Sequence, residues 1–261
     1  MTMLRKAHFL AGAAAAAFSG AAATAAQAED FTYSFNLGGF SDYRFRGFSQ
    51  TGEEPAIQGG ADFGYGIGYF GIWASNLDFG LDGAGHDIAN AEVDIYGGIK
   101  PVWGPVTFDL GVIYYAYPAA HDSAAELNYV ELKLGASGNL TNELAVGTTF
   151  YWSPDYTGEL GDVYTIEGTA SYALPKVWVF SPSLGGRIGY QEGDSAGYAT
   201  LFGNGADHYW YWDAGLTLTV EKFAFDFRYI DTDVSDAGGF CNGALFQCDS
   251  TFVASVKVTL P

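Results

Sequence analysis

The chain has 261 residues, a length that suits one large domain or two small ones. Its 30 acidic and 11 basic residues give a formal net charge of -19, which argues against nucleic acid as a partner because phosphate backbones need a basic face. Aromatic residues make up 17% and charged residues 16%, a balance that excludes an acidic disordered chain.

The first 28 residues have the pattern of a secretory signal peptide. Arg5 and Lys6 form a basic start, an uncharged Ala-rich stretch covers 8–25, and residues 26–28 read Ala-Gln-Ala, a small-residue cleavage site. We therefore expect residues 1–28 to be removed and residues 29–261 to form the exported protein. No later stretch reaches the roughly 18 apolar residues of a membrane helix, so we expect no transmembrane helix.

The rest of the sequence alternates between apolar and polar residues, which predicts strands with one apolar face. From Val130 to Leu134, for example, valine and leucine alternate with glutamate and lysine. Each segment reaches about the 9–11 residues that a tilted strand needs to cross a bilayer. Twelve such segments lie at 31–46, 55–65, 68–78, 88–100, 105–117, 127–137, 143–153, 162–173, 177–190, 208–219, 222–231 and 250–260.

The connections between these segments alternate in length. Those after the even-numbered segments are short, as at 66–67 and 220–221, and those after the odd-numbered segments are long, up to 232–249. An even strand count with short turns at one end and long loops at the other is typical of outer-membrane barrels. The sequence predicts an all-β fold, a single antiparallel transmembrane β-barrel of about 12 strands with short periplasmic turns and long extracellular loops.

The charged residues are distributed as a membrane barrel requires. When the apolar face of each segment points outward, eleven segments place no Asp, Glu, Lys or Arg on that face, and only 68–78 is an exception. A Lys or Arg that faces lipid at mid-depth costs about 2–4 kcal/mol. A soluble β-sandwich is the alternative, but Trp103 and Trp178 at short turns and Tyr114 and Trp210 near long loops indicate two interfacial girdles.

Several blocks of residues match a known family. Residues 41–47 read Ser-Asp-Tyr-Arg-Phe-Arg-Gly, and together with 49–51 and 58–60 they resemble the opening signature of the TorF-like porins. The similarity continues through 68–80 to 226–232. The resemblance implies a barrel in a Gram-negative outer membrane, surrounded by lipid and lipopolysaccharide, with a channel role.

Charged residues of both signs occupy the inward face, where we expect them to line the pore. Twelve strands fall between the eight that side chains fill and the 16–18 that leave a wide channel. We expect a narrow, mildly cation-preferring pore for small solutes, although a non-conducting structural barrel stays open as an alternative. The predicted pore-lining residues are Asp42, Arg44, Arg46, Asp62, Glu92, Asp94, Asp109, Glu131, Lys133, Glu167, Arg187, Asp213, Asp226, Arg228 and Lys257.

Seven inward tyrosines should narrow this pore further. They are Tyr96, Tyr115, Tyr117, Tyr129, Tyr151, Tyr209 and Tyr211.

Arg44 and Arg46 receive the most specific expectation. They lie two residues apart in the first segment, so both should face the lumen near its outer end. They would either form a constriction or solute-binding site, or neutralise inward acids such as Asp62, Glu92 and Asp94.

The long loops contain many acidic residues and no Lys or Arg. They could be a solvated acidic surface or could bind divalent cations, but no calcium-loop spacing is present and we assign no metal ligands. Cys241 and Cys248 lie in the last long loop, and export predicts that they form a disulfide.

The sequence does not favour an enzyme, and we expect no cofactor. His86, His121 and His208 all lie in or beside long loops, and His208, which follows Asp207, is the only candidate base. An outer-membrane enzyme that acts on lipid is therefore the less favoured alternative to a channel.

Overall fold

The computed structural model describes residues 31–82, 84–121, 126–201, 206–234, 241 and 247–261. The predicted signal peptide, residues 1–28, lies outside the described residues. The helix α1 (Ala196–Leu201) has 6 residues and lies between the strands β12 and β13. Across the described ranges, no helix has the length and apolar character needed to cross a membrane.

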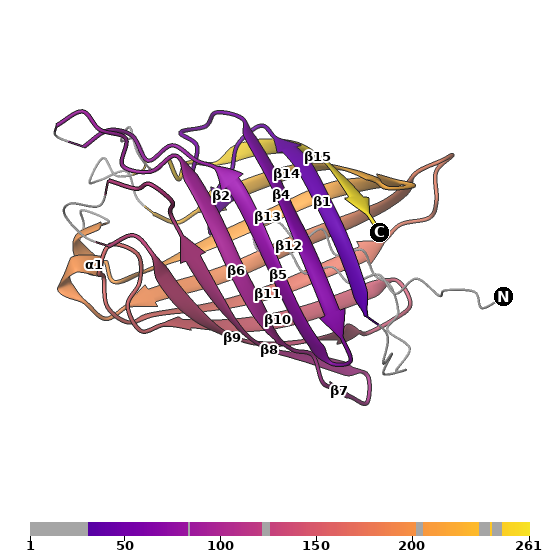
Figure 1. Cartoon of the computed structure of the whole chain (residues 1–261). Coiled ribbons are helices and arrows are strands. Elements are labelled where there is room, and N and C mark those ends of the chain that lie inside the picture. Colours follow the sequence, from indigo (N-terminus) through magenta and orange to yellow (C-terminus); the bar gives the residue numbers. More distant parts are fainter. Residues whose placement is uncertain (1–30, 83, 122–125, 202–205, 235–240, 242–246) are drawn as a thin grey trace.

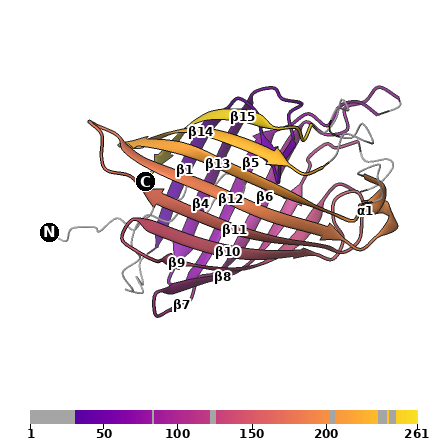
Figure 2. The same cartoon turned by 180° about the vertical axis from the view of Figure 1, so that it is seen from behind.

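Twelve antiparallel strands form a closed barrel (Figure 1, with the opposite wall in Figure 2). Neighbours along the chain pair with each other, and β15 pairs with β1, so that the sheet closes on itself. The barrel strands are β1 (Thr32–Phe40), β4 (Ala56–Tyr65), β5 (Gly68–Asn76), β6 (Ala91–Ile99), β8 (Val106–Ala116), β9 (Tyr129–Asn139), β10 (Leu144–Ser153), β11 (Val163–Ala173), β12 (Ser181–Gly193), β13 (His208–Val220), β14 (Phe223–Thr232) and β15 (Thr251–Leu260).

Three two-residue strands complete the described structure. The strand β7 (Val102–Trp103) pairs with the beginning of β8 in the turn that follows β6. The strands β2 (Arg44–Phe45) and β3 (Phe48–Ser49) pair only with each other, in a small separate hairpin between β1 and β4.

The prediction of an all-β antiparallel barrel with 12 strands is confirmed, and each predicted segment overlaps one barrel strand. The first segment, 31–46, is too long, because β1 ends at Phe40. A continuing strand would place Tyr43 on the lipid-facing side, but its side chain is buried and its ring packs 5.5 Å from that of Trp73, between ring centres. Packing inside the barrel therefore overrides the alternating pattern at this point.

The third segment, 68–78, is also shorter than predicted. The strand β5 ends at Asn76, and the backbone N–H of Asp78 donates to the carbonyl of Gln50, 2.8 Å away, in the β1–β4 connection. Asp78 has therefore left the barrel wall. Because β5 itself contains no charged residue, the single exception on the outward face disappears.

The barrel is apolar outside and polar inside. Large apolar side chains such as Leu37, Ile166 and Phe227 are more than half exposed on the outer face. Carboxylates such as Glu92 and Glu131 are almost fully buried. A water-soluble barrel would have the opposite arrangement, so the outer surface suits hydrocarbon and the interior suits water and ions.

Aromatic side chains mark the two ends of this apolar band. Trp103 and Trp178 are 81% and 84% exposed at the end with short turns. Tyr114 and Trp210 are exposed toward the end with long loops. These positions agree with the interfacial girdles typical of outer-membrane barrels.

Inward-facing tyrosine rings lie against glycines on neighbouring strands. Gly71 pairs with Tyr96 and Gly189 pairs with Tyr211 across the sheet. A Cβ atom at either glycine would overlap the tyrosine ring. These glycines therefore let large rings lie flat along the inner wall.

We expect the mature protein, extracted into detergent, to have a circular dichroism spectrum dominated by β-structure. It should also migrate faster on a denaturing gel before boiling than after, because a closed sheet of 12 strands resists detergent. A helical spectrum, or solubility without detergent, would contradict the barrel.

We expect Gly189→Ala to lower the free energy of unfolding by about 1–3 kcal/mol, because the new methyl group overpacks the ring of Tyr211. Urea unfolding in lipid vesicles measures the change. Gly39→Ala is the matched control, since nothing lies within 4 Å of a Cβ atom at Gly39. Equal changes in the free energy of unfolding for the two substitutions would show that contact with the Tyr211 ring does not restrict the size of the side chain at position 189.

Candidate functional site

The connection between β1 and β4, residues 41–55, folds into the barrel and is named here the inserted segment. The hydroxyl of Tyr43 donates to Glu92 on β6 over 2.8 Å, while Phe48 packs against Tyr209 on β13 with 5.1 Å between ring centres. The inserted segment thus contacts two separate parts of the barrel wall, and it crosses the interior near the end with long loops.

Short polar side chains hold the inserted segment in shape. The hydroxyl of Ser49 donates to Asp42 Oδ1 over 2.7 Å, and the backbone N–H of Tyr43 donates to Thr51 Oγ1 over 3.2 Å. Arg46 and Gly47 have φ values of 49° and 92°, which turn the chain back between β2 and β3. A left-handed conformation is easy for glycine and costly for arginine, so the contacts of Arg46 must hold it there.

Arg46 reaches the wall of the barrel through a buried bidentate ion pair. Its Nη1 and Nη2 donate to the two carboxylate oxygens of Glu131 on β9, over 2.7 and 2.8 Å. The guanidinium also lies over the rings of Phe45 and Tyr151, 4.7 and 5.0 Å from the ring centres. Side-chain exposure is 3% for Arg46 and 1% for Glu131, so each charge depends on the other.

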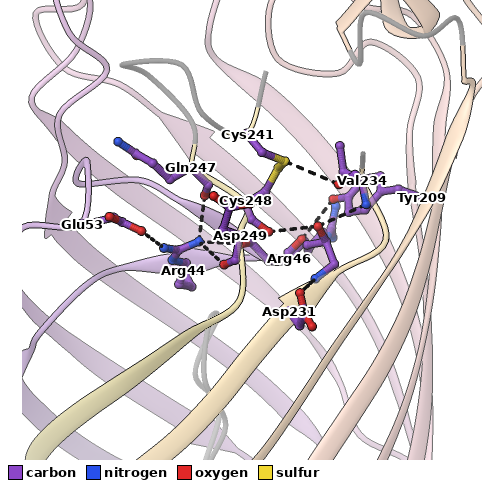
Figure 3. The surroundings of a disulfide bond; sticks show 12 residues. Arg44, Arg46, Glu53, Tyr209, Asp231, Val234, Cys241, Gln247, Cys248 and Asp249 are labelled. Atoms are coloured by element: carbon purple, nitrogen blue, oxygen red, sulfur yellow. Dashed lines mark hydrogen bonds and ion pairs between the residues drawn. A yellow bond between two sulfur atoms is a disulfide. The ribbon is translucent and has the colours of Figure 1, made fainter. Parts of the chain in front are cut away.

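Arg44 makes different contacts and joins the inserted segment to the last long loop (Figure 3). Its guanidinium pairs with Asp42 and, over 2.7 Å, with Glu53 Oε1. Nη1 donates to the backbone carbonyl of Gln247, 2.8 Å away. The expectation that one strand carries both arginines is wrong, because β1 ends at Phe40, and the two buried side chains contact different partners.

The partners of the two arginines also differ from those expected. Asp42, Glu53 and Glu131 neutralise them, rather than Asp62, Glu92 and Asp94. The sequence offers no signal for the pair with Glu131, which lies 85 residues away along the chain. Cys241 and Cys248 form a disulfide beside this region, and the carbonyl of Cys248 accepts a hydrogen bond from Thr232 Oγ1 over 3.0 Å.

A second group of charges follows one side of the barrel wall. Arg187 on β12 lies between Glu167 and Asp213, at 3.2 and 2.9 Å. Arg228 on β14 pairs with Asp213 and, over 3.0 Å, with Asp226. This network spans four adjacent strands, β11 to β14, and joins three carboxylates to two arginines.

A third group lies toward the end with short turns. Lys133 Nζ donates to Asp109 Oδ2 over 2.8 Å, and the hydroxyl of Tyr69 donates to Asp109 Oδ1 over 2.7 Å. Asp62 on β4 accepts a hydrogen bond from the hydroxyl of Tyr96 over 2.6 Å. Lys257 on β15 stands opposite Gly38 of β1 and Ala224 of β14.

Asp94 on β6 differs from the other buried carboxylates. Its side chain is almost fully buried, yet neither carboxylate oxygen has a hydrogen-bond partner among the described residues. Glu92 lies two residues earlier on the same inward face. No arginine or lysine in the described part of the chain forms an ion pair with either carboxyl group of this pair.

The structure leaves none of the fifteen predicted pore-lining residues exposed on the outer surface. All are buried or half-buried, in the inserted segment or on inward positions of the barrel strands. Gln191 is not among the predicted residues, yet its side-chain oxygen lies 3.4 Å from Arg46 Nη1, and no motif indicates this contact.

The candidate catalytic histidine lies apart from these groups. His208 Nδ1 is 2.7 Å from Asp207 Oδ1, and its ring centre is 5.5 Å from that of Tyr190. Both side chains of the His208–Asp207 pair are about half exposed, at the end of the barrel with long loops.

The barrel is similar in fold to two solved porins. The KdgM porin, in a complex with disordered oligogalacturonate, has a TM-score of 0.51 and 9% identity over 88% of this chain and 100% of that chain. The NanC porin has a TM-score of 0.52 and 10% identity over 86% of this chain and 97% of that chain. At these identities the similarity establishes the fold alone.

No curated protein sequence matches the chain. A family model described as a bacterial protein of unknown function, Gcw_chp, matches residues 22–260. This match covers nearly the whole sequence. The chain therefore belongs to the Gcw_chp family of bacterial proteins.

Proposed function

We propose that the protein is a porin-like channel of the Gram-negative outer membrane, of the TorF-like type, for passive diffusion of small solutes. The observation that carries this proposal is the closed barrel of 12 strands, with an apolar exposed outer face and an interior lined by charged side chains. Burying charges in a purely structural core costs desolvation free energy, whereas water and ions in a pore solvate them.

The pathway that we propose is narrow and mildly cation-preferring. The inserted segment crosses the interior, and tyrosine rings lie along the wall, so both reduce the bore. Nine of the fifteen inward charged residues are acidic. A lumen in which one sign prevails concentrates ions of the opposite sign.

A non-conducting structural barrel is the second candidate. The bidentate Arg46–Glu131 pair favours it, because this pair joins the inserted segment to the wall and could close the lumen completely. We propose no catalytic role for the pair formed by His208 and Asp207. Purified protein in planar lipid bilayers distinguishes these candidates: a channel gives unitary currents, a structural barrel gives none, and an enzyme that acts on lipid releases hydrolysis products.

In a KCl gradient, we expect the reversal potential to indicate a modest preference for cations. The preference should shrink at high salt, since the Debye length falls from about 10 Å at 0.1 M to about 3 Å at 1 M. Asp109→Asn should reduce it by removing one inward negative charge without changing the side-chain volume. Glu143→Gln is the control, because it removes the same charge from an exposed turn. An anion-selective reversal potential would refute the proposed selectivity.

We expect the double substitution Arg46→Ala/Glu131→Ala to raise the single-channel conductance, because it removes the link that holds the inserted segment to β9. The matched control is Arg187→Ala/Glu167→Ala, which is also charge-neutral but removes a pair between adjacent wall strands. Equal conductance changes in the two variants would contradict a constriction at Arg46.

Arg46→Ala alone should lower the free energy of unfolding by about 3–5 kcal/mol, because it leaves Glu131 buried without its partner. The double variant with Glu131→Ala should recover part of this loss. Chemical denaturation of both variants in detergent measures the difference. A single variant as stable as the wild type would show that the buried ion pair does not contribute to the free energy of unfolding.

A further inference from the structure

Two histidines and one aspartate lie close together in the loops at the end of the barrel with long loops. Asp82 and His86 lie in the connection between β5 and β6, and His121 lies in the connection between β8 and β9. The Nδ1 atoms of His86 and His121 are 3.1 and 3.0 Å from the same oxygen, Asp82 Oδ2. Each residue offers one ligand atom, and these three atoms lie within 4.8 Å of one another.

Backbone hydrogen bonds fix the positions of these three residues. The N–H of Asp82 donates to the carbonyl of His86 over 2.8 Å, and the N–H of Gly85 donates to the carbonyl of Asp82 over 3.0 Å, which closes a tight turn. The N–H of His121 donates to the carbonyl of Ile88 over 2.8 Å and thereby joins the second loop to the first. The two ligand-bearing loops are therefore held together by the main chain.

Side-chain contacts complete the arrangement. The imidazole rings of His86 and His121 stack with 4.3 Å between their centres and 23° between their planes. Asp82 Oδ1 accepts the backbone N–H groups of His86 and Ala84, over 2.9 and 2.8 Å, which leaves Oδ2 for the imidazoles.

Two of the three ligand–ligand distances lie close to those of a tetrahedral metal site. Zinc binds histidine nitrogen and carboxylate oxygen at about 2.0–2.2 Å, so two ligands of a tetrahedron stand about 3.3–3.5 Å apart. The two nitrogen–oxygen distances found here, 3.0 and 3.1 Å, would need to lengthen only slightly to admit the ion. The side chains of the histidines are 56% and 44% exposed, so a metal ion can reach the site from solution.

We propose that Asp82, His86 and His121 form a binding site for a divalent metal of the zinc type, with water in the remaining position. Imidazole nitrogen suits zinc, copper and nickel, whereas calcium and magnesium prefer sites made of oxygen alone. This site differs from the oxygen-ligand site for hard divalent cations that the acidic loops suggest, because two of its three ligand atoms are nitrogen. The site does not depend on whether the barrel conducts.

Isothermal titration of ZnCl₂ into the full chain, folded in detergent, tests the proposal. We expect wild-type protein to bind one Zn²⁺, and His86→Ala or His121→Ala to weaken this binding by at least about tenfold, since even the outer-shell partners of metal ligands are worth 10–100-fold. His208→Ala is the matched control, because His208 contacts a carboxylate at 2.7 Å but is not part of a three-residue cluster among the described residues. It should leave the affinity unchanged.

Two outcomes would overturn the site: wild-type protein that binds no Zn²⁺, or equal affinities in all three histidine variants. Displacement of Zn²⁺ by excess Ca²⁺ would also overturn it, because it would indicate an oxygen-only site elsewhere in the loops. A measurement on wild-type protein alone removes any doubt about folding of the variants. Bound Co²⁺ should give the intense visible absorption of tetrahedral coordination, and the weak absorption of an octahedral ion would contradict the geometry.

Discussion

The pairing of β15 with β1 is the constraint on which the rest of the structure depends. A bilayer contains no water to satisfy an unpaired backbone N–H or carbonyl group, so a sheet that spans it must close. Closure divides every strand into an outer and an inner row of side chains. The outer row becomes the apolar, exposed surface, and the inner row, including Glu131 and Asp213, becomes the interior. The distribution of charge in the sequence follows from this division.

Charges placed inside a closed wall must find partners or water. On β11 to β14 the partners come from neighbouring strands, so Arg187 and Arg228 share the carboxylate of Asp213. At Glu131 the partner comes from outside the wall, because the inserted segment carries Arg46 to it. The same contact that neutralises a buried carboxylate therefore narrows the interior. Asp94 receives no such partner among the described residues.

The sequence could predict the barrel because alternation and turn length are local properties of a strand. It could also predict that Arg44 and Arg46 are internal, because polar side chains on that parity do not face lipid. It could not predict where they point, since parity assumes that the strand continues and β1 ends at Phe40. Nor could it predict the cluster around Asp82, because His121 joins it through a hydrogen bond to Ile88 in another loop. Both failures concern contacts between distant segments that no local pattern encodes.

Closure also explains why the first and last loops meet. The inserted segment follows β1 and the disulfide loop precedes β15, so the pairing of these two strands brings residues more than 200 positions apart into contact. Arg44 uses this proximity by donating to the carbonyl of Gln247, next to Cys248 (Figure 3). The disulfide with Cys241 restricts the loop that supplies this carbonyl. The position of the inserted segment is thus fixed at two points, by the wall through Arg46 and by the last loop through Arg44, and both depend on the closed sheet.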